Sequence, residues 1–363
     1  MADIRTADAI PSWDSITASW LTDRLHEAGH TAVSVRGFTR TQIGTGQIGK
    51  CICFALDLEG NDPAAPRTLV GKFPSDDPTS RATGVALKNY IKEVSFYRQM
   101  QKRVTISTPR CYYAQIEGEG PNFALLLADL SPAKQGDQLA GCSVDVARAA
   151  VLELVGLHAP SWCDETLRGI DWIGAPDGAG ADMTRMLYAA QLPGFLARYG
   201  AKLAADEIEI IERVAESKSV PFEGLPSPFS LIHIDYRLDN LLIDETVRPM
   251  KISVVDWQSI TLGSPLGDVA YFLGAGLVSE DRRRVERDIV HAYHAALSAA
   301  GIRDYPWERC WNDYRRGAFA GFAVTVIASM LVQQTPRGDD MFITMARRHS
   351  RHALDVGARE FLG

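Results

Sequence analysis

The chain has 363 residues, of which 46% are hydrophobic and 23% are charged, and its net charge is −7. This composition is typical of globular proteins and excludes wholesale disorder, collagen and coiled coil. The acidic balance also disfavours a nucleic-acid partner, because a protein that coats nucleic acid needs an excess of basic side chains. The length predicts one large domain or two unequal domains.

The six cysteines are scattered along the chain, and Cys51 and Cys53 lack the spacing of a zinc clip. We interpret these two thiols as apolar filler on one face of a strand. The first residues show neither a basic start nor an apolar run, so no secretory signal is predicted. The uncharged stretch 317–336 is short for a bilayer span and is predicted to be a buried helix. The expected compartment is therefore the cytoplasm, with no membrane partner.

The first third of the chain has the composition of β-strands. Enrichment in β-branched and aromatic residues predicts about five strands, within residues 33–38, 51–58, 69–73, 111–117 and 122–128. Apolar residues at helical spacing predict one main helix over residues 83–101. Residues 129–142 are rich in turn-forming types and are interpreted as a hinge or connector.

From residue 143 onward, helical periodicity dominates the sequence. It predicts helices within residues 144–158, 182–199, 205–217, 281–300, 307–334 and 338–356. One strand–turn–strand region interrupts them at residues 229–258. The predicted fold class is α+β, with a small β-rich N-terminal lobe (1–128) and a large helical C-terminal lobe (143–363). A cleft between two lobes is a favoured ligand site.

Three glycines, Gly44, Gly46 and Gly49, form the pattern G-x-G-x-x-G. Glycines let a backbone turn tightly and bring its N–H groups close to phosphate oxygens. A dinucleotide fold needs a helix after such a loop, but the residues from Lys50 onward look like a strand, which disfavours a nucleotide-dependent oxidoreductase. Two interpretations of the loop alone stand, a hairpin that covers nucleotide phosphates and an ordinary hairpin turn.

Lys72 lies in the middle of a short apolar strand, between Val70 and Phe73. A buried ammonium group without a partner is strongly unfavourable, so an anionic partner is expected. Glu93, on the predicted helix that follows, can supply it. Protein kinases and their relatives orient a lysine onto the α- and β-phosphates of ATP through such a pair. The alternative is an edge-strand lysine and a solvated helix glutamate.

The strongest motif is H-x-D-x-x-x-x-N, formed by His233, Asp235 and Asn240, and Asp256 follows the next apolar strand. Phosphoryl transfer needs a carboxylate that accepts or orients the proton of the attacking hydroxyl, and oxygen ligands for Mg²⁺. We assign Asp235 as the base and Asn240 and Asp256 as metal ligands, and we expect His233 to brace the loop by hydrogen bonds. For each residue alone, the alternative is a turn or capping role.

The sequence resembles the aminoglycoside phosphotransferase and choline-kinase-like superfamily, and it looks closest to the ecdysteroid-kinase-like branch. The resemblance is carried by HIDYRLDN at 233–240, VVDWQ at 254–258, GDVAYFL at 267–273, LLLADL at 125–130 and LHA at 157–159. It implies a bilobal protein-kinase-like fold and an ATP- and Mg²⁺-dependent kinase that phosphorylates a hydroxyl of a small molecule. It also implies that backbone groups from Ala128 to Leu130 bind the adenine, and that Asp256 is the metal-binding aspartate of kinases.

Two positions depart from the family pattern. Ile234 stands where such families usually have glycine, and Ala128 stands where the hinge usually has glutamate. We expect Ile234 to change the conformation of the loop without loss of chemistry. For Asp268 two roles stand, acceptance of backbone hydrogen bonds from the catalytic loop and an N-cap of the following helix. Arg237 is expected to pair with Asp239 or another acid rather than to neutralise the transferred phosphate.

The acceptor pocket is expected among the C-terminal helices. Residues 307, 311, 314 and 318 share one helical face, which is more often core than pocket. If part of this aromatic stripe lines the pocket, a lipophilic alcohol such as a sterol or a hydroxyacyl compound fits better than a sugar. The alternative function is a pseudokinase-like module that binds a nucleotide or metabolite without turnover. A protein kinase is disfavoured, because Asp-Trp-Gln at 256–258 replaces the expected Asp-Phe-Gly.

Overall fold

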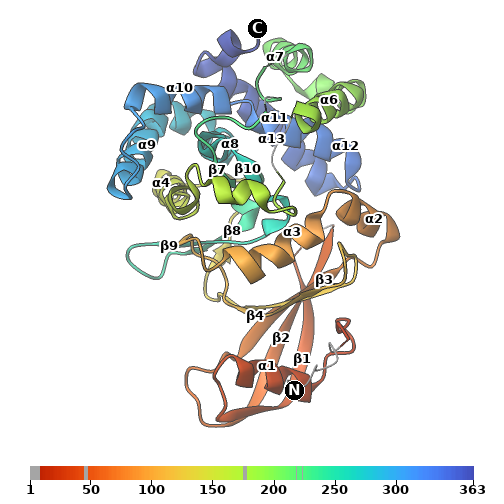
Figure 1. Cartoon of the computed structure of the whole chain (residues 1–363). Coiled ribbons are helices and arrows are strands. Elements are labelled where there is room, and N and C mark those ends of the chain that lie inside the picture. Colours follow the sequence, from red (N-terminus) through yellow and green to blue (C-terminus); the bar gives the residue numbers. More distant parts are fainter. Residues whose placement is uncertain (1–8, 45–47, 175–177, 218, 223) are drawn as a thin grey trace. The chain divides into compact units, whose positions relative to one another are not determined.

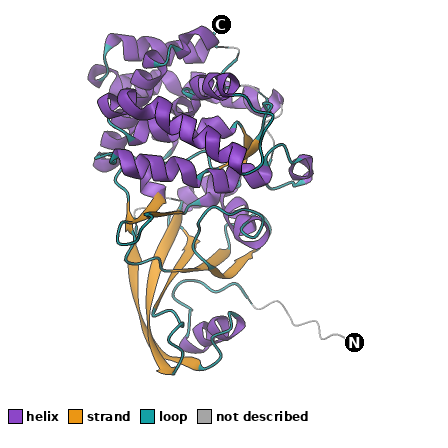
Figure 2. Ribbon diagram, turned by 90° about the vertical axis from the view of Figure 1, so that its left-hand side faces the viewer, coloured by secondary structure: helices purple, strands orange, loops and turns teal. Residues whose placement is uncertain are grey.

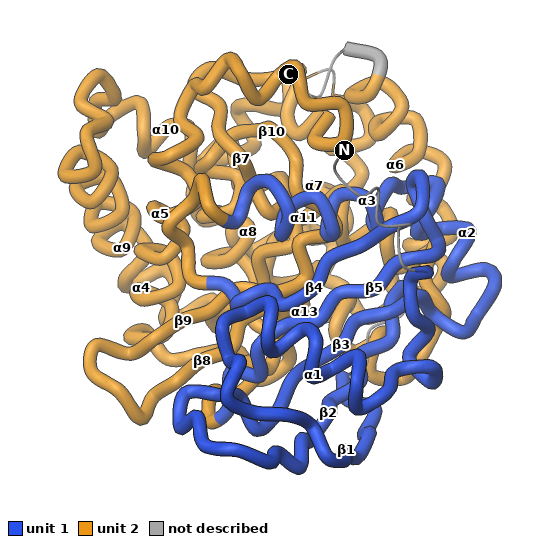
Figure 3. The backbone as a smooth tube through the Cα atoms, turned by 60° about the horizontal axis from the view of Figure 1, so that its bottom comes forward, with its two compact units in different colours: residues 1–101, 108–131 blue, residues 102–107, 132–363 orange. Residues whose placement is uncertain are grey.

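The computed structural model describes residues 9–44, 48–174, 178–217, 219–222 and 224–363 (Figure 1). The chain divides into two compact units (Figure 3). The first contains residues 1–101 and 108–131, and the second contains residues 102–107 and 132–363. Long strands characterise the first unit and helices the second (Figure 2).

The first unit is built on a five-stranded antiparallel sheet with the order β1-β2-β3-β5-β4. Its strands are β1 (Val33–Ile43), β2 (Gly49–Gly60), β3 (Thr68–Pro74), β4 (Cys111–Ile116) and β5 (Phe123–Ala128). The five predicted strands are thus confirmed, although β1 runs five residues beyond its predicted end and β2 begins earlier than predicted. The glycine loop joins β1 to β2, whose pairing reaches Ile43 opposite Cys51. The prediction that a strand follows this loop is therefore confirmed.

A helix covers each face of this sheet. On one face, Phe54, Leu69 and Phe73 share a core with Leu21 and Leu25 of α1 (Ala18–Glu27), a helix that was not predicted from the sequence. The opposite face carries α3 (Asn89–Ser95). Its Tyr90 ring stacks on the Phe123 ring of β5, with the centroids 4.8 Å apart.

The prediction of one continuous helix over residues 83–101 is wrong, because the helix is interrupted. The segment forms α2 (Pro78–Ala86), then α3, and then a π-helical turn from Phe96 to Met100. The break is at Lys88, whose φ of 58° lies in the left-handed region that lysine rarely adopts. The apolar spacing stays in phase across this residue, so periodicity alone does not reveal the break.

The second unit is predominantly helical. Its helices are α4 (Val144–Glu153), α5 (Val155–His158), α6 (Gly178–Tyr199), α7 (Ala205–Glu216), α8 (Pro265–Gly276), α9 (Ser279–Ala299), α10 (Trp307–Gly317), α11 (Ala320–Ala323), α12 (Ser329–Leu331) and α13 (Pro336–Asp355). Helix α8 is buried on every side from residue 268 to residue 276, as its largely apolar composition requires. The helix predicted over 307–334 is broken into α10, α11, a π-helical turn at Val324–Ala328, and α12. No helix within the described residues is long and apolar enough to cross a membrane.

Five short strands accompany these helices and confirm the strand–turn–strand region predicted at 229–258. Strand β7 (Ser230–Ile232) pairs with β10 (Thr261–Gly263), and β8 (Leu241–Asp244) pairs with both β6 (Lys134–Gln135) and β9 (Lys251–Val254). The predicted catalytic loop joins β7 to β8, and Asp256 follows β9. These strands therefore hold the ends of the motif that the sequence singled out.

Two buried histidines, His349 and His352, lie one turn apart on α13. They pack against glycine: a Cβ added to Gly274 of α8 would lie 2.7 Å from Nδ1 of His352, and one added to Gly321 would lie 2.2 Å from Nε2 of His349. Burial, together with the charge of Arg348, lowers the pKa of His349 to about 3. Burial also lowers the pKa of His352, although Glu286 lies 3.6 Å from its Nε2. Both imidazoles are therefore neutral in the folded protein at neutral pH.

Acidification is expected to destabilise the protein through these two histidines. Below a pH of about 6.5 the unfolded chain binds a proton on each histidine that the folded chain does not bind. The free energy of unfolding should then fall by about 1.4 kcal/mol per pH unit for each histidine. Urea denaturation at several pH values below neutrality measures this slope. A His349→Gln variant should show a shallower slope, and equal slopes would contradict the assignment.

Candidate active site

Lys72 and Glu93 form the predicted ion pair. The Lys72 ammonium lies 2.8 Å from Oε1 and 2.7 Å from Oε2 of Glu93. The two side chains are only 12% and 3% exposed, so neither is a solvated surface residue. Lys72 lies on β3 and Glu93 on α3. The ion pair therefore fixes the Lys72 ammonium group on the face of the sheet that α3 covers.

A half-buried strip of β2 and β3 lies beside this pair. Cys51 pairs with Lys72 and Cys53 with Val70, and directly opposed residues of an antiparallel ladder share a face. The two thiols are half-buried on one face of a strand, as predicted. Burial raises the pKa of the Cys53 thiol, which therefore stays protonated. Gly49 belongs to the same strip, and a Cβ added there would lie 3.1 Å from Cε of Lys72.

The remaining nucleotide-site predictions fall on the glycine loop and on the end of β5. Gly44 has a φ of 72°, which suits glycine, and Gly46 lies outside the described residues. Ala128 ends β5, and its N–H donates to the carbonyl oxygen of Arg110 at 2.8 Å. That amide is therefore engaged within the unit. The Leu130 amide, in contrast, has no hydrogen-bond partner among the described residues.

The backbone of the predicted catalytic loop (233–240) is held by hydrogen bonds to Asp268 of α8. Its Oδ2 accepts the N–H of His233 at 2.6 Å, and its Oδ1 accepts the N–H of Ile234 at 2.9 Å. The first of the two roles predicted for Asp268 is confirmed, and the N-cap role is wrong, because the N-cap of α8 is Ser264. Behind it, Nε2 of His158 lies 3.5 Å from Oδ2 of Asp268.

His233 braces the loop, as predicted. Its Nε2 lies 3.0 Å from the carbonyl oxygen of Val255, and its ring packs edge-on against the Trp257 ring, 4.9 Å away between centroids. The imidazole is completely buried, so it does not face a substrate. It joins the catalytic loop to the segment that carries Asp256.

Ile234 adopts a left-handed backbone conformation that favours glycine. Its φ of 69° lies in the left-handed region, where the Cβ of a residue other than glycine meets the following carbonyl oxygen. A β-branched residue at this angle is strained, and the hydrogen bond from its N–H to Asp268 holds it there. The backbone at residue 234 therefore takes a left-handed angle that suits glycine, and the expectation that Ile234 changes the conformation of the loop stays a prediction.

Replacement of Ile234 by glycine is expected to change the free energy of unfolding by no more than about 1 kcal/mol, because release of about 1–2 kcal/mol of left-handed strain offsets the lost side-chain contacts. The matched control is Ile232→Gly in β7, a half-buried isoleucine in extended backbone. It should cost about 3 kcal/mol, because no strain is released there. Chemical denaturation measures the free energy of unfolding of both variants. Equal losses of stability in the two variants would contradict the strain at Ile234.

The Asp235 carboxylate is surrounded by hydrogen-bond donors. Its Oδ1 accepts from the Tyr271 hydroxyl and from Arg237 Nε, each at 2.9 Å. Its Oδ2 accepts from Asn240 Nδ2 at 2.9 Å and lies 3.1 Å from Arg237 Nε. The side chain is 19% exposed, so the carboxylate is fixed in orientation and still reaches the surface of its unit.

Asn240 and Asp256 lie at the same end of the β8–β9 hairpin. Leu241 pairs with Val254, and the N–H of Val255 donates to the carbonyl oxygen of Asn240 at 3.1 Å. The Asn240 amide nitrogen also donates to the Asp235 backbone oxygen at 2.8 Å, so its Oδ1 points away from that contact. Amide and carboxylate oxygens are ligands that Mg²⁺ prefers.

These two oxygen donors fit a metal ion that is held mainly by substrate phosphates, which commonly takes only one or two carboxylate or amide ligands from the protein. In the described part of the chain, no group of three or more His, Cys, Asp or Glu side chains is arranged to hold a metal ion by itself. The residues therefore suit a metal ion that enters with a nucleotide.

Arg237 pairs with acids, as expected. Its NH1 lies 2.6 Å from Asp239 Oδ2, and Arg337 of α13 lies 3.2 Å from Asp239 Oδ1. Burial alone would raise the pKa of the Asp239 carboxyl, but the charge of Arg237 and the hydrogen bond from Arg337 lower it overall. Burial disfavours the charged guanidinium of Arg237, yet the charges of Asp235 and Asp239 raise its pKa. Asp235 and Asp239 are thus balanced by Arg237 and Arg337.

The sequence did not reveal two residues that shape this loop. The completely buried Gln138 donates its backbone N–H to Asp239 Oδ1 at 3.1 Å, and its Oε1 accepts the N–H of Leu238 at 2.9 Å. The second is Tyr271, which we named only within the segment GDVAYFL at 267–273. Each lies tens of residues away in sequence from its partner, so no local spacing could indicate the contact.

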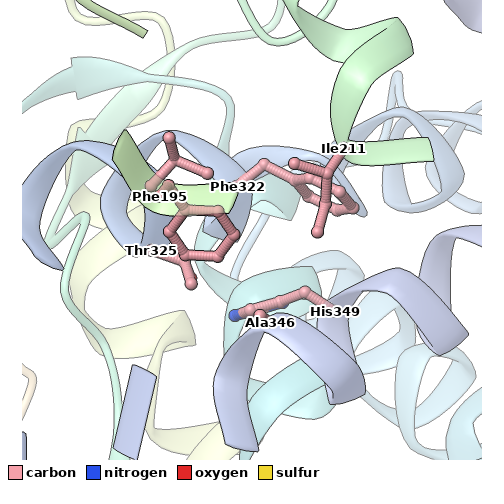
Figure 4. Close-up of a pocket in the computed structure, with 7 residues that line it drawn as sticks. Phe195, Ile211, Phe322, Thr325, Ala346 and His349 are labelled. Atoms are coloured by element: carbon pink, nitrogen blue, oxygen red, sulfur yellow. The ribbon is translucent and has the colours of Figure 1, made fainter. Parts of the chain in front are cut away.

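Helices of the second unit leave a narrow apolar gap between their side chains, too small to admit a water molecule (Figure 4). Its lining residues are Phe195, Ile211, Phe322, Thr325, Val326, Ala346 and His349. The predicted stripe on α10 lies elsewhere: the Trp307, Trp311 and Tyr314 rings stack in sequence, and Arg287 of α9 covers the first two. Tyr314 and Ala318 are buried, so the core interpretation holds for this end of the stripe.

Comparison with known proteins identifies the fold. The model of the family described as "Phosphotransferase enzyme family" matches residues 66–311. No curated protein gives a significant match. The choline kinase of Cryptosporidium parvum Iowa II has a TM-score of 0.55 at 9% identity, over 96% of this chain and 92% of that chain.

Two further solved structures are similar. The ethanolamine kinase of Plasmodium vivax has a TM-score of 0.52 at 11% identity, over 93% of this chain and 86% of that chain. An APH(2") aminoglycoside phosphotransferase in complex with GDP and kanamycin has a TM-score of 0.51 at 12% identity, over 83% of this chain and 91% of that chain. At these identities the likeness concerns the fold, and it confirms the predicted α+β, protein-kinase-like class.

The family match runs from just before β3 to α10 and includes Lys72, Glu93, the catalytic loop, Asp256 and Asp268. It thus covers well over half of the chain and confirms the predicted resemblance to the aminoglycoside phosphotransferase superfamily, whereas the ecdysteroid-kinase-like branch stays a prediction. This protein belongs to the phosphotransferase enzyme family.

Proposed function

We propose that this protein is a small-molecule kinase that uses ATP and Mg²⁺ to phosphorylate a hydroxyl, with Asp235 as the base. The observation that carries the proposal is the orientation of Asn240. Its amide nitrogen donates to the Oδ2 of Asp235, which leaves its Oδ1 for a cation at the end of the hairpin where Asp256 also lies. One side chain thereby links the proposed base to the proposed metal ligands.

In this proposal, residues 1–128 bind the nucleotide, residues 129–142 form the connector and residues 143–363 carry the catalytic loop and the acceptor pocket. Lys72, fixed by Glu93, contacts the α- and β-phosphates, and Gly44, Gly46 and Gly49 cover them. The small side chains of the β2–β3 strip leave room for the nucleotide. Of the hinge groups, the unpaired Leu130 amide is the best-placed donor to adenine, whereas Ala128 contributes at most its carbonyl oxygen, because its N–H already donates to Arg110.

Asn240 and Asp256 would hold Mg²⁺, which neutralises negative charge on the phosphates as they react. The acceptor hydroxyl donates its hydrogen bond to Asp235, and its oxygen attacks the γ-phosphorus as the bond from that phosphorus to the β–γ bridging oxygen breaks. The proton passes to the Asp235 carboxylate and then to solvent. Because the transition state of phosphoryl transfer is loose, orientation of the hydroxyl contributes more than early removal of its proton.

For the acceptor we propose a lipophilic alcohol rather than a polycation. Polycationic substrates need a surplus of negative charge, and Asp235 and Asp239 are already balanced by Arg237 and Arg337. Choline, ethanolamine and kanamycin, named for the similar structures, all carry amino or ammonium groups, so we expect this chain to differ from them in its acceptor.

The test is a panel of hydroxylated compounds incubated with the purified protein, ATP and Mg²⁺, read by ADP release and product mass. The panel includes sterols, hydroxyacyl compounds, sugars and aminoglycosides. We expect a singly phosphorylated product from an apolar alcohol, and no product when ATP or Mg²⁺ is omitted. Turnover of aminoglycosides with none of any apolar alcohol would overturn the acceptor class. Tight ATP binding without product from any compound would favour the pseudokinase-like alternative.

A further inference from the structure

We propose that Tyr271 is a positioning residue that decides which oxygen of Asp235 receives the acceptor hydroxyl. The inference rests on the proposed role of Asp235 as the base. The Tyr271 hydroxyl donates to Asp235 Oδ1 at 2.9 Å, and the tyrosine is 1% exposed. It therefore touches the proposed base without reaching a substrate.

The hydrogen bonds around Asp235 leave one acceptor site for a substrate. An ionised carboxylate offers about four lone-pair sites on its two oxygens. Tyr271 and Arg237 fill both sites of Oδ1, at 2.9 Å each. Asn240 takes one site of Oδ2 at 2.9 Å, and the Nε–H of Arg237, shared between the two oxygens, also reaches Oδ2 at the longer distance of 3.1 Å. Three donor hydrogens thus face about four lone-pair sites. The second site of Oδ2, which only the longer branch of the shared Arg237 bond reaches, is the one that an acceptor hydroxyl can take.

Tyr271 is itself held rigidly. Its ring packs against the neutral imidazole of His349, with the centroids 5.1 Å apart, and it belongs to the buried core of the second unit. Figure 4 shows the His349 ring among the side chains that line the narrow apolar gap. A side chain fixed by packing on all sides holds its hydrogen-bond partner within a narrow range of angles.

The Tyr271 hydroxyl remains a hydrogen-bond donor, because it does not lose its proton. Burial, together with the charge of Asp235, raises the pKa of the Tyr271 hydroxyl far above its ordinary value, so the phenol keeps its proton at every working pH. Tyr271 also lies one turn after Asp268 on α8. One buried helix thus fixes the loop backbone through Asp268 and the reacting carboxylate through Tyr271.

Without the hydroxyl, a second acceptor site opens on Oδ1. The substrate hydroxyl or a water molecule can then bind the carboxylate in an unproductive orientation, which lowers the fraction of productive complexes. Loss of such a positioning contact commonly lowers activity by about 10- to 100-fold. Because the nucleotide does not use this contact, the KM for ATP should stay nearly unchanged.

The experiment is a double-mutant cycle with Tyr271→Phe and Asp235→Asn, in which the acceptor found by the panel is used. Tyr271→Phe keeps the ring that packs on His349 and removes only the hydroxyl. We expect kcat to fall by about tenfold, with the KM for ATP within about twofold, and we expect the effect to vanish in the Asp235→Asn background. The matched control is Tyr188→Phe, a buried tyrosine whose hydroxyl donates to the Ile211 carbonyl oxygen at 3.0 Å.

The outcomes separate this inference from the proposed function. A Tyr271→Phe enzyme with wild-type kcat, beside an inactive Asp235→Asn enzyme, overturns the positioning role alone. An equal loss from Tyr271→Phe in both backgrounds also overturns it, because Tyr271 would then act independently of Asp235. Wild-type activity in Asp235→Asn overturns the proposed base itself. Tyr188→Phe should lower the melting temperature about as much as Tyr271→Phe does, but it should leave kcat unchanged.

Discussion

Asp235→Asn is expected to lower kcat by about 10²- to 10⁴-fold, the usual contribution of a general base. The amide has nearly the shape of the carboxylate, so the loop should keep its geometry, but it offers a weaker acceptor to the substrate hydroxyl. ATP does not depend on this interaction in its ground state, so its affinity should stay within about twofold. Steady-state kinetics and calorimetric titration with ATP measure the two quantities.

Two results would contradict this expectation. A wild-type rate in the variant with a confirmed acceptor would remove Asp235 from the chemistry. A large loss of ATP affinity would mean that the carboxylate acts through the fold of the nucleotide site, whereas its hydrogen bonds in the structure run to the catalytic loop and to Tyr271.

Asp256→Ala is expected to abolish Mg²⁺-dependent binding of ATP and to lower turnover by about 10³-fold, which corresponds to the several kcal/mol that a metal ion supplies at a transferring phosphoryl group. Asn240 alone then offers a single neutral oxygen from this hairpin, which is a poor site for a hard dication. Titration of ATP at increasing Mg²⁺ concentration measures the change.

The control for this variant lies on the same hairpin. Asp244 ends β8 opposite Lys251, at the far end from Asn240, and its side chain caps the turn through the Thr246 N–H at 2.9 Å. Asp244→Ala removes an equal charge and should leave turnover unchanged. With EDTA present, the wild type and Asp256→Ala should bind ATP equally weakly. A difference that persists in EDTA would show that Asp256 acts on the fold rather than on the metal.

The strands of the first unit could be predicted from the sequence because their pattern is local. The buried and half-buried residues of β3 alternate strictly, and a Gly-rich loop between two apolar runs is typical of a hairpin. Lys72 was predicted to need a partner on the following helix because burial of a lone charge is unfavourable at that position whatever surrounds it. These inferences need only neighbours in sequence and the physics of burial.

The elements that were missed depend on contacts between distant segments. Helix α1 is short and mostly polar, and its two buried residues, Leu21 and Leu25, are too few to form a clear periodic pattern. The breaks at Lys88 and after Gly317 leave the apolar spacing in phase, so they follow from tertiary packing rather than from propensity. Periodicity predicts that a segment is helical more reliably than where it stops.

The site follows the same division. Asp235, Asn240 and Asp256 could be singled out because each stands at a strand end within one short region. The roles of Asp268 and Tyr271 depend on how α8 lies under that region, and the sequence left the first open and the second unassigned. Ile234 is the instructive case, because a residue that breaks the family pattern still takes the left-handed angle, held there by Asp268.

The central claim is that the γ-phosphate of ATP moves to an alcohol oriented by Asp235. The most direct measurement follows a γ-labelled ATP in a single turnover with the preferred alcohol, by wild-type protein and by Asp235→Asn. We predict that the label appears on the alcohol with the wild type and stays on ATP with the variant. Label recovered only as free phosphate, or equal transfer by both proteins, would contradict the account.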